Sequence, residues 1–234
     1  HGLIHAFSHF DSAKSTQRVF DRYRGSNVRK IYQEDIETLA TQVMMHVGRL
    51  NAKKGWTMQL HLGAVRNNNT RLAREIGADV GCDSIGDYSQ AENLSRFLDA
   101  LDNENALPKT VLYNVNPADN YVFGTMAGNF ADGTTPGKVQ FGSGWWFVDQ
   151  KEGMEWQINA LSNLGLLSRF IGMLTDSRSF MSFPRHEYFR RTLCNLIGKD
   201  VEAGLLPNDD ALVGGMVKNI CYANAKAYLG LVKG

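Results

Sequence analysis

The chain has 234 residues, of which 43% are hydrophobic, so it can bury a substantial core, and we expect one domain spanning residues 1–234. Its 25 Lys and Arg residues nearly balance 24 Asp and Glu residues. This balance argues against binding to nucleic acid or to an anionic membrane surface. No apolar run approaches the roughly 20 residues that a membrane-spanning helix needs. The expected partner is a small molecule.

Three cysteines, Cys82, Cys194 and Cys221, are widely spaced and contain no CxxC pair. An odd number without that spacing argues against a disulfide framework or a zinc ribbon. The N-terminus also lacks the basic, apolar and small-residue order of a signal peptide. We therefore expect the protein to work in a reducing cytoplasm.

Short apolar runs alternate with helical periodicity along the chain. Apolar residues at spacings near three and four predict helices at about 31–53, 88–102, 117–129 and 150–166, and two more in the tail. Apolar runs bounded by glycine or polar residues predict strands at 56–62, 109–115, 138–141 and 170–175. This alternation indicates an α/β fold with a parallel sheet, either an open sheet or part of a (β/α)₈ barrel.

Polar residues follow each predicted strand, where parallel α/β folds place their active sites. Asp176 ends the apolar run 170–175, so its charge would need compensation by a metal ion or a cation such as Arg178. The equal alternative is that Asp176 caps a helix or pairs with Arg178 structurally. Asp176 is thus a candidate metal ligand or base.

Three further positions carry both a structural and a functional interpretation. His61 follows a mostly apolar strand, where a lone histidine is more often structural than catalytic. Trp145 and Trp146 follow glycines and could be core residues or could stack on a sugar ring. The stretch around Arg185, Arg190 and Arg191 is predicted to be a helix with a solvated basic face.

Several long segments resemble uronate isomerases of the amidohydrolase superfamily. They are WTMQLHLGAVRNNNTR (56–71), DSIGD (83–87), GKVQFGSGWWF (137–147), GMLTDSRSF (172–180) and RHEYFRRTLCNLIG (185–198), with a looser match at residues 1–3. The resemblance implies a (β/α)₈ barrel of the amidohydrolase type, of which this chain supplies about strands 4 to 8, with strand 8 ending at Asp176.

The same resemblance implies the chemistry. The reaction would be aldose–ketose isomerisation of D-glucuronate to D-fructuronate and of D-galacturonate to D-tagaturonate, with one divalent metal ion, expected to be zinc. It implies catalytic roles for Asp176, Arg178 and His61, with Asp176 binding the metal. It places Trp145, Trp146 and Arg66 around the hexuronate substrate. A homo-oligomer is also expected.

One departure from the family pattern concerns the metal. The family has a His-x-His pair on its first strand, and no His-x-His occurs in these 234 residues. Two alternatives therefore stay open beside the isomerase: a metal-dependent hydrolase of the same superfamily, and a non-catalytic half-barrel that pairs its edge strands with another chain.

Overall fold

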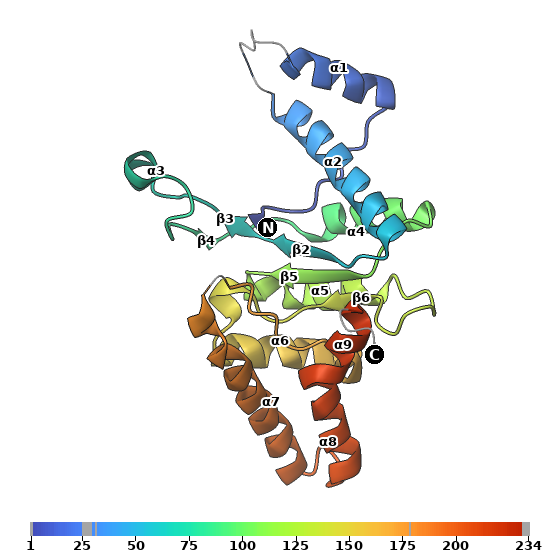
Figure 1. Ribbon diagram of the computed structural model, residues 1–234, viewed down its shortest axis with the longest axis vertical. Coiled ribbons are helices and arrows are strands. Elements are labelled where there is room, and N and C mark those ends of the chain that lie inside the picture. The colour runs from blue at the N-terminus through green and yellow to red at the C-terminus, as the bar shows by residue number, and fades with distance from the viewer. Residues whose placement is uncertain (1, 25–29, 31, 178, 231–234) are drawn as a thin grey trace.

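A parallel four-stranded sheet lies at the centre of the protein in a computed structural model, which describes residues 2–24, 30, 32–177 and 179–230 (Figure 1). The strand order is β1-β2-β5-β6, and all three neighbouring pairs are parallel. The strands are β1 (Gly2–Leu3), β2 (Met58–Leu62), β5 (Thr110–Asn114) and β6 (Val139–Phe141). The predicted α/β class, its parallel sheet and three of the four predicted strands are confirmed.

Helices connect these strands and extend beyond the last one. Up to β6 they are α1 (Ala13–Arg24), α2 (Gln33–Lys54), α3 (Thr70–Ile76), α4 (Ala91–Asn103), the 3₁₀ turn η1 (Pro117–Asp119) and α5 (Asn120–Gly128). After β6 come the turn η2 (Trp146–Val148), α6 (Lys151–Leu164), the turns η3 (Leu167–Arg169) and η4 (Phe180–Ser182), α7 (Pro184–Glu202), α8 (Asp210–Lys218), the π-helix η5 (Asn219–Ala223) and α9 (Asn224–Leu229). The helices predicted from periodicity are present, whereas α1 and α3 were not predicted.

The two faces of the sheet have different neighbours, because side chains alternate along a strand. Leu60 and Leu62 of β2 and Leu112 of β5 join the main core under the helices. Four α4 residues pack there at helical spacing and are fully buried: Leu94, Phe97, Leu98 and Leu101. The opposite face carries Gln59 and His61 of β2, with Tyr113 of β5 in a smaller apolar cluster. This second face leads to the site described below.

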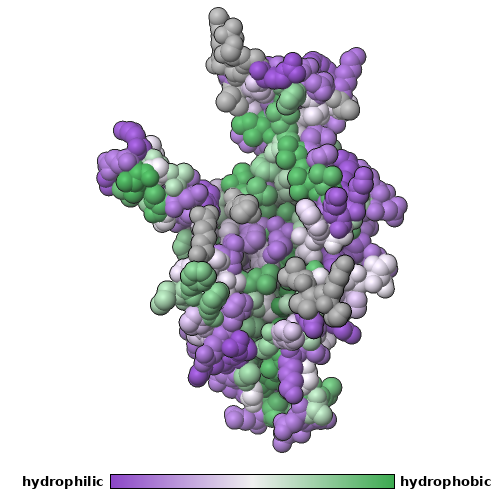
Figure 2. Space-filling view, in the orientation of Figure 1, coloured by the Kyte–Doolittle hydropathy of each residue, from purple (hydrophilic) through white to green (hydrophobic). Residues whose placement is uncertain are grey.

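Helix α2 confirms the predicted helix, except for residue 31, which lies outside the described residues. Glu34 and Asp35 in its first turn and Lys53 and Lys54 in its last turn complement the helix dipole. Its buried face, however, consists of polar, small and methionine side chains. Of the apolar residues whose spacing predicted this helix, Leu39 and Ala40 are partly buried, whereas Ile36, Val43, Val47 and Leu50 are exposed, and hydrophobic surface is visible along α2 in Figure 2.

The segment 170–175 is buried as predicted but is not a strand. Gly172 has a φ of +74°, which breaks an extended run, and its close approach to the Ile220 carbonyl leaves no room for a side chain. Side chains of the β6 region, rather than backbone hydrogen bonds between strands, hold the segment in place. Gln140 donates to the Arg169 carbonyl, and Ser143 accepts from the Leu174 amide. The prediction of a strand ending at Asp176 was therefore wrong.

A small antiparallel hairpin, β3 (Ala64–Val65) with β4 (Ser84–Ile85), follows β2 directly. It carries α3, which has no buried residues and projects from the body of the protein (Figure 1). This excursion places the loop residues 66–83 beside the carboxyl ends of the parallel strands. Among the described helices, none is long and apolar enough to cross a membrane.

Candidate active site

A cleft of about 890 Å³ opens at the carboxyl ends of the strands. The loop after β6, the loop before η4, the first turn of α7 and the β3–β4 excursion contribute its walls. Its lining residues are Arg66, Asp79, Gly81, Asp83, Trp145, Trp146, Asp149, Thr175, Asp176, Ser177, Ser179 and Arg185. Predicted site residues from three separate sequence segments, Arg66, Trp145 with Trp146, and Asp176, therefore converge on one site.

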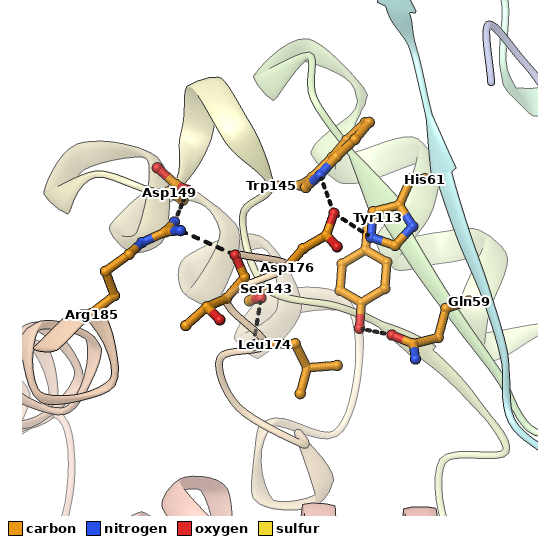
Figure 3. A network of polar contacts seen from close by, with 10 residues as sticks. Gln59, His61, Tyr113, Ser143, Trp145, Asp149, Leu174, Asp176 and Arg185 are labelled. Atoms are coloured by element: carbon orange, nitrogen blue, oxygen red, sulfur yellow. Dashed lines mark hydrogen bonds and ion pairs between the residues drawn. The ribbon is translucent and has the colours of Figure 1, made fainter. Parts of the chain in front are cut away.

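Asp176 extends into this cleft from the end of the buried segment 170–175 (Figure 3). Its carboxylate Oδ2 accepts a hydrogen bond from Trp145 Nε1 at 3.2 Å and lies 3.7 Å from His61 Nε2. The side chain is 54% exposed, so its charge is partly solvated although the preceding run is buried. The predicted alternative of a helix cap is wrong for the following turn, because Ser179 caps η4.

His61 lies among aromatic rings at the end of β2. Its ring stacks on Tyr113 with centroids 4.4 Å apart and meets the edge of Trp145 at 4.8 Å. Burial lowers the pKa of His61 to about 4, against the opposing effect of the Asp176 charge, so the imidazole is neutral at pH 7. Its Nδ1 is buried and has no hydrogen-bond partner among the residues that the structure describes. A neutral ring with a nitrogen directed at Asp176 can exchange hydrogen bonds with a ligand in the cleft.

The two tryptophans differ in their surroundings: one is a core residue and the other is accessible to a ligand. Trp145 is buried in the smaller apolar cluster, whereas Trp146 is 36% exposed and lines the cleft. Their rings stack with centroids 4.9 Å apart. Trp146 has a φ of +53°, a conformation that L-residues rarely adopt. Trp145 thus orients Asp176, and Trp146 presents a ring to the cleft.

Arg66 lies over the Trp146 ring, with its guanidinium carbon 4.8 Å from the ring centroid. It forms an ion pair with Asp79, and its Nε lies 3.6 Å from Asp83 Oδ1. Both carboxylates come from the excursion after β3, which sequence reasoning did not assign to the site. A ligand carboxylate that binds Arg66 must therefore displace or share the Asp79 contact.

Comparison with known proteins places these residues in a family. A family model described as glucuronate isomerase matches residues 1–229. The chain belongs to the glucuronate isomerase family. Curated relatives named uronate isomerase include those of Solibacter usitatus and Opitutus terrae, 62% and 60% identical over 231 residues, or 99% of this chain. The chain spans about half the length of these relatives, 49% and 48%.

Solved structures of the glucuronate isomerase family have the same arrangement of elements. A uronate isomerase from Thermotoga maritima superposes with a TM-score of 0.87 at 31% identity, covering 98% of this chain and 48% of that one. A glucuronate isomerase from Caulobacter crescentus superposes with a TM-score of 0.86 at 22% identity, covering all of this chain and 47% of that one, which supports the fold alone.

Arg185 is a site residue that sequence reasoning missed. The prediction of a solvated basic face holds for the exposed Arg190 and Arg191, but Arg185 at the start of α7 turns into the cleft. It donates to the Thr175 carbonyl at 3.0 Å and forms an ion pair with Asp149. The segments GMLTDSRSF (172–180) and RHEYFRR (185–191) are close in the sequence. This closeness was the signal that could have assigned Arg185 to the site of Asp176. Arg178 lies outside the described residues.

Two side chains at the cleft have the chemistry of metal ligands. Asp176 and His61 are ligand types that zinc accepts, and they lie beside each other at the cleft. Within residues 2–24, 30, 32–177 and 179–230, no group of three His, Cys, Asp or Glu side chains could hold a metal ion. A catalytic zinc site takes three protein ligands. Asp176 and His61 thus have suitable donor chemistry but could supply only two of those three ligands.

Proposed function

We propose that the protein is a uronate isomerase, which interconverts D-glucuronate with D-fructuronate and D-galacturonate with D-tagaturonate. The observation that carries this proposal is the position of Asp176. Within a chain of the glucuronate isomerase family, its carboxylate stands half exposed in a cleft and is oriented by a buried indole. A carboxylate that is both fixed and accessible suits proton transfer to carbon.

The isomerisation moves one proton between adjacent carbons. In the forward direction the Asp176 carboxylate removes the C2 proton, and the C2–H electron pair forms the double bond of an enediol as the C1 carbonyl oxygen gains charge. Asp176 then returns the proton to C1, while the C2 hydroxyl loses its proton and becomes the keto group. The neutral ring of His61, 3.7 Å from Asp176, is suited to hold the proton that passes between the two oxygens.

A divalent metal ion, which we expect to be zinc, would be held by Asp176 with ligands beyond the described residues. When bound, such an ion polarises a carbonyl and stabilises the charge that develops on its oxygen. Arg178, two residues after Asp176 in the sequence, is proposed to stabilise the same charge. Chelation of the metal should abolish isomerase activity, and adding Zn²⁺ back should restore it; unchanged activity after chelation would remove the metal from the proposal.

Substrate recognition is assigned to Trp146 and Arg66, which line the same cleft. The exposed ring of Trp146 offers an apolar face to the sugar, and Arg66 above it offers two parallel N–H donors to the substrate carboxylate. Because Asp79 already pairs with Arg66, this binding requires the Asp79 contact to open or to be shared. Arg66→Lys should therefore raise KM for the hexuronate more than it lowers kcat.

The decisive test is Asp176→Asn, which keeps the size of the side chain and its acceptor oxygen while removing the base. We expect kcat to fall by about 10³-fold or more, with the thermal unfolding midpoint within a few degrees of wild type. Conversion should be followed by NMR, which separates aldose from ketose and would equally reveal a hydrolase acting on an amide. Asp99→Asn, on the exposed side of α4, is the matched control.

Two results would decide against the proposal. A kcat for Asp176→Asn within tenfold of wild type would remove Asp176 from the proton transfer. Hydrolysis of amide substrates without any ketose would favour the metal-dependent hydrolase instead.

Three broader expectations belong to the same proposal. The parallel order β1-β2-β5-β6 agrees with four consecutive strands of a (β/α)₈ barrel. Cys82, Cys194 and Cys221 are free thiols, which supports a reducing cytoplasm. A homo-oligomer is expected, and sedimentation analysis of the protein would measure it; a tight oligomer without bound metal or activity would instead favour the non-catalytic half-barrel.

A further inference from the structure

We propose that Arg185 is a positioning residue for the isomerisation: it fixes the peptide unit that enters Asp176 and joins the two loops that meet at the Asp176 carboxylate. The inference rests on the proposed function, in which Asp176 moves the proton. It concerns how that carboxylate is held in place. Arg185 acts through its neighbours and does not contact the reacting atoms itself.

The backbone at Asp176 has an unusual conformation. Its φ of +43° lies in the left-handed region, which L-residues rarely adopt and which persists only where neighbouring groups hold it. The Thr175 carbonyl belongs to the same peptide unit as the Asp176 nitrogen, and Arg185 Nη1 donates to that carbonyl at 3.0 Å. This hydrogen bond therefore fixes the orientation of the peptide plane on the N-terminal side of the Asp176 N–Cα bond.

The other amino group of the Arg185 guanidinium binds the loop after β6. Arg185 Nη2 forms an ion pair with Asp149, which ends the turn η2 and whose amide donates to the Trp146 carbonyl at 3.4 Å. The same loop carries Trp145, whose indole donates to Asp176 (Figure 3). The loop after β6 thus contacts the segment leading to Asp176 through Ser143, through Trp145 and through Asp149, and the Asp149 contact runs through Arg185 of α7.

The contacts of Arg185 suit a positioning residue better than a substrate ligand. Arg185 and Asp149 also line the cleft, and a free guanidinium there would be a natural partner for a uronate carboxylate. The charge of Arg185 is already balanced by Asp149, and its second amino group is committed to a backbone carbonyl. Arg66 is also paired, with Asp79, but the Asp79 side chain is 55% exposed against 25% for Asp149, so its contact opens more readily and Arg66 is the candidate for that carboxylate.

The experiment measures Arg185→Ala, Arg185→Lys and the control Arg191→Ala with the gene product that carries this chain. Arg191 lies on the same helix with a side chain 77% exposed and pairs with Glu187 one turn away. We expect Arg185→Ala to lower kcat by about 10²-fold, as misplacement of a reacting group does, with KM within about threefold. Lys can replace only one of the two contacts, so Arg185→Lys should recover part of kcat.

A second readout does not depend on activity. The ¹⁵N–¹H signal of the Trp145 indole, assigned with Trp145→Phe, reports the hydrogen bond to Asp176. It should shift in Arg185→Ala and stay in place in Arg191→Ala. If Arg185→Ala does not fold, Asp149→Asn keeps the carbonyl contact and removes the ion pair, and it should give a smaller change of the same kind.

The outcomes separate the two proposals. A raised KM with unchanged kcat in Arg185→Ala would make Arg185 a substrate ligand and overturn the positioning role. An unmoved indole signal, or equal losses in Arg191→Ala, would overturn it as well. A wild-type protein without isomerase activity whose indole signal still shifts in Arg185→Ala would sink the proposed function while leaving the positioning of Asp176 established.

Discussion

His61 illustrates how a polar side chain becomes functional through its neighbours. Tyr113 and Trp145 surround its ring with aromatic surface, which removes water from the imidazole and disfavours its charged form. A single carboxylate, Asp176, lies close enough to oppose this effect and does not cancel it. The histidine is therefore held neutral beside a carboxylate, an arrangement that suits proton exchange with a bound sugar.

This environment predicts a dependence of stability on pH. The pKa of His61 is about 4 in the folded protein, below its ordinary value of 6.5, so between these values the unfolded chain binds more protons. Stability should rise with pH through this window and should be lost as the pH falls from about 6.5 toward 4. The contribution is about 1–3 kcal/mol, since one pKa unit corresponds to about 1.4 kcal/mol.

Urea unfolding of the metal-free protein at pH 4.5 and 7 would measure this effect. His61→Gln should reduce the loss of stability on acidification, whereas His46→Gln, which alters an exposed side chain on α2, should retain the wild-type loss. Equal losses in wild type and His61→Gln would contradict the prediction.

At the scale of elements, the segment 170–175 and the π-helix η5 depend on each other. Gly172 combines a φ of +74° with an approach to the Ile220 carbonyl that leaves no space for a Cβ. Ile220 is fully buried, so η5 cannot move away without opening the core. The absence of a side chain at residue 172 thus allows the chain to turn toward Asp176 against this helix.

A pair of glycine substitutions tests this packing. Gly172→Ala should destabilise the protein by about 2 kcal/mol or more, because it adds both backbone strain and a clash. Gly198→Ala lies within α7, where a Cβ meets no atom within 4 Å, and it should stabilise by about 0.5–1 kcal/mol. Thermal unfolding of the two variants should show opposite shifts; a shift in the same direction would contradict the account.

At the scale of the whole molecule, stability is concentrated around the central sheet. Strands β2 and β5 pair along five residues each and lie between two apolar clusters, the larger under the helices and the smaller beside the cleft. Helix α3, by contrast, buries no residue and stands on the β3–β4 hairpin. The cleft lies between these two regions, so one wall is rigid and the other has little tertiary packing.

Hydrogen exchange should follow this division. Amides of Leu60–Leu62 and Val111–Tyr113 are expected to exchange slowest, near the rate of global unfolding, and those of Thr70–Ile76 fastest among the helices. Mass spectrometry of exchanged peptides would measure both. Protection of α3 equal to that of β5 would show that the excursion is packed against another part of the protein.

Local sequence was sufficient for the order of the elements. Spacings of two and of three to four follow from strand and helix geometry, so β2, β5, β6 and the long helices were predicted with ends within about three residues. Polar residues at the carboxyl ends of parallel strands share one edge, and this placed Asp176, His61, Trp145, Trp146 and Arg66 at a common site.

Only the tertiary structure decided which of these faces are covered and which side chains meet. Periodicity identifies apolar residues such as Val43 and Val47 on α2 but not what packs on them, and the helix leaves these two exposed. An apolar run indicates burial but not a hydrogen-bonded neighbour, so 170–175 was taken for a strand. Arg185 joins the site because the first turn of α7 lies beside Thr175 and Asp149. Such contacts between distant segments depend on the packing of whole elements, which no local pattern encodes.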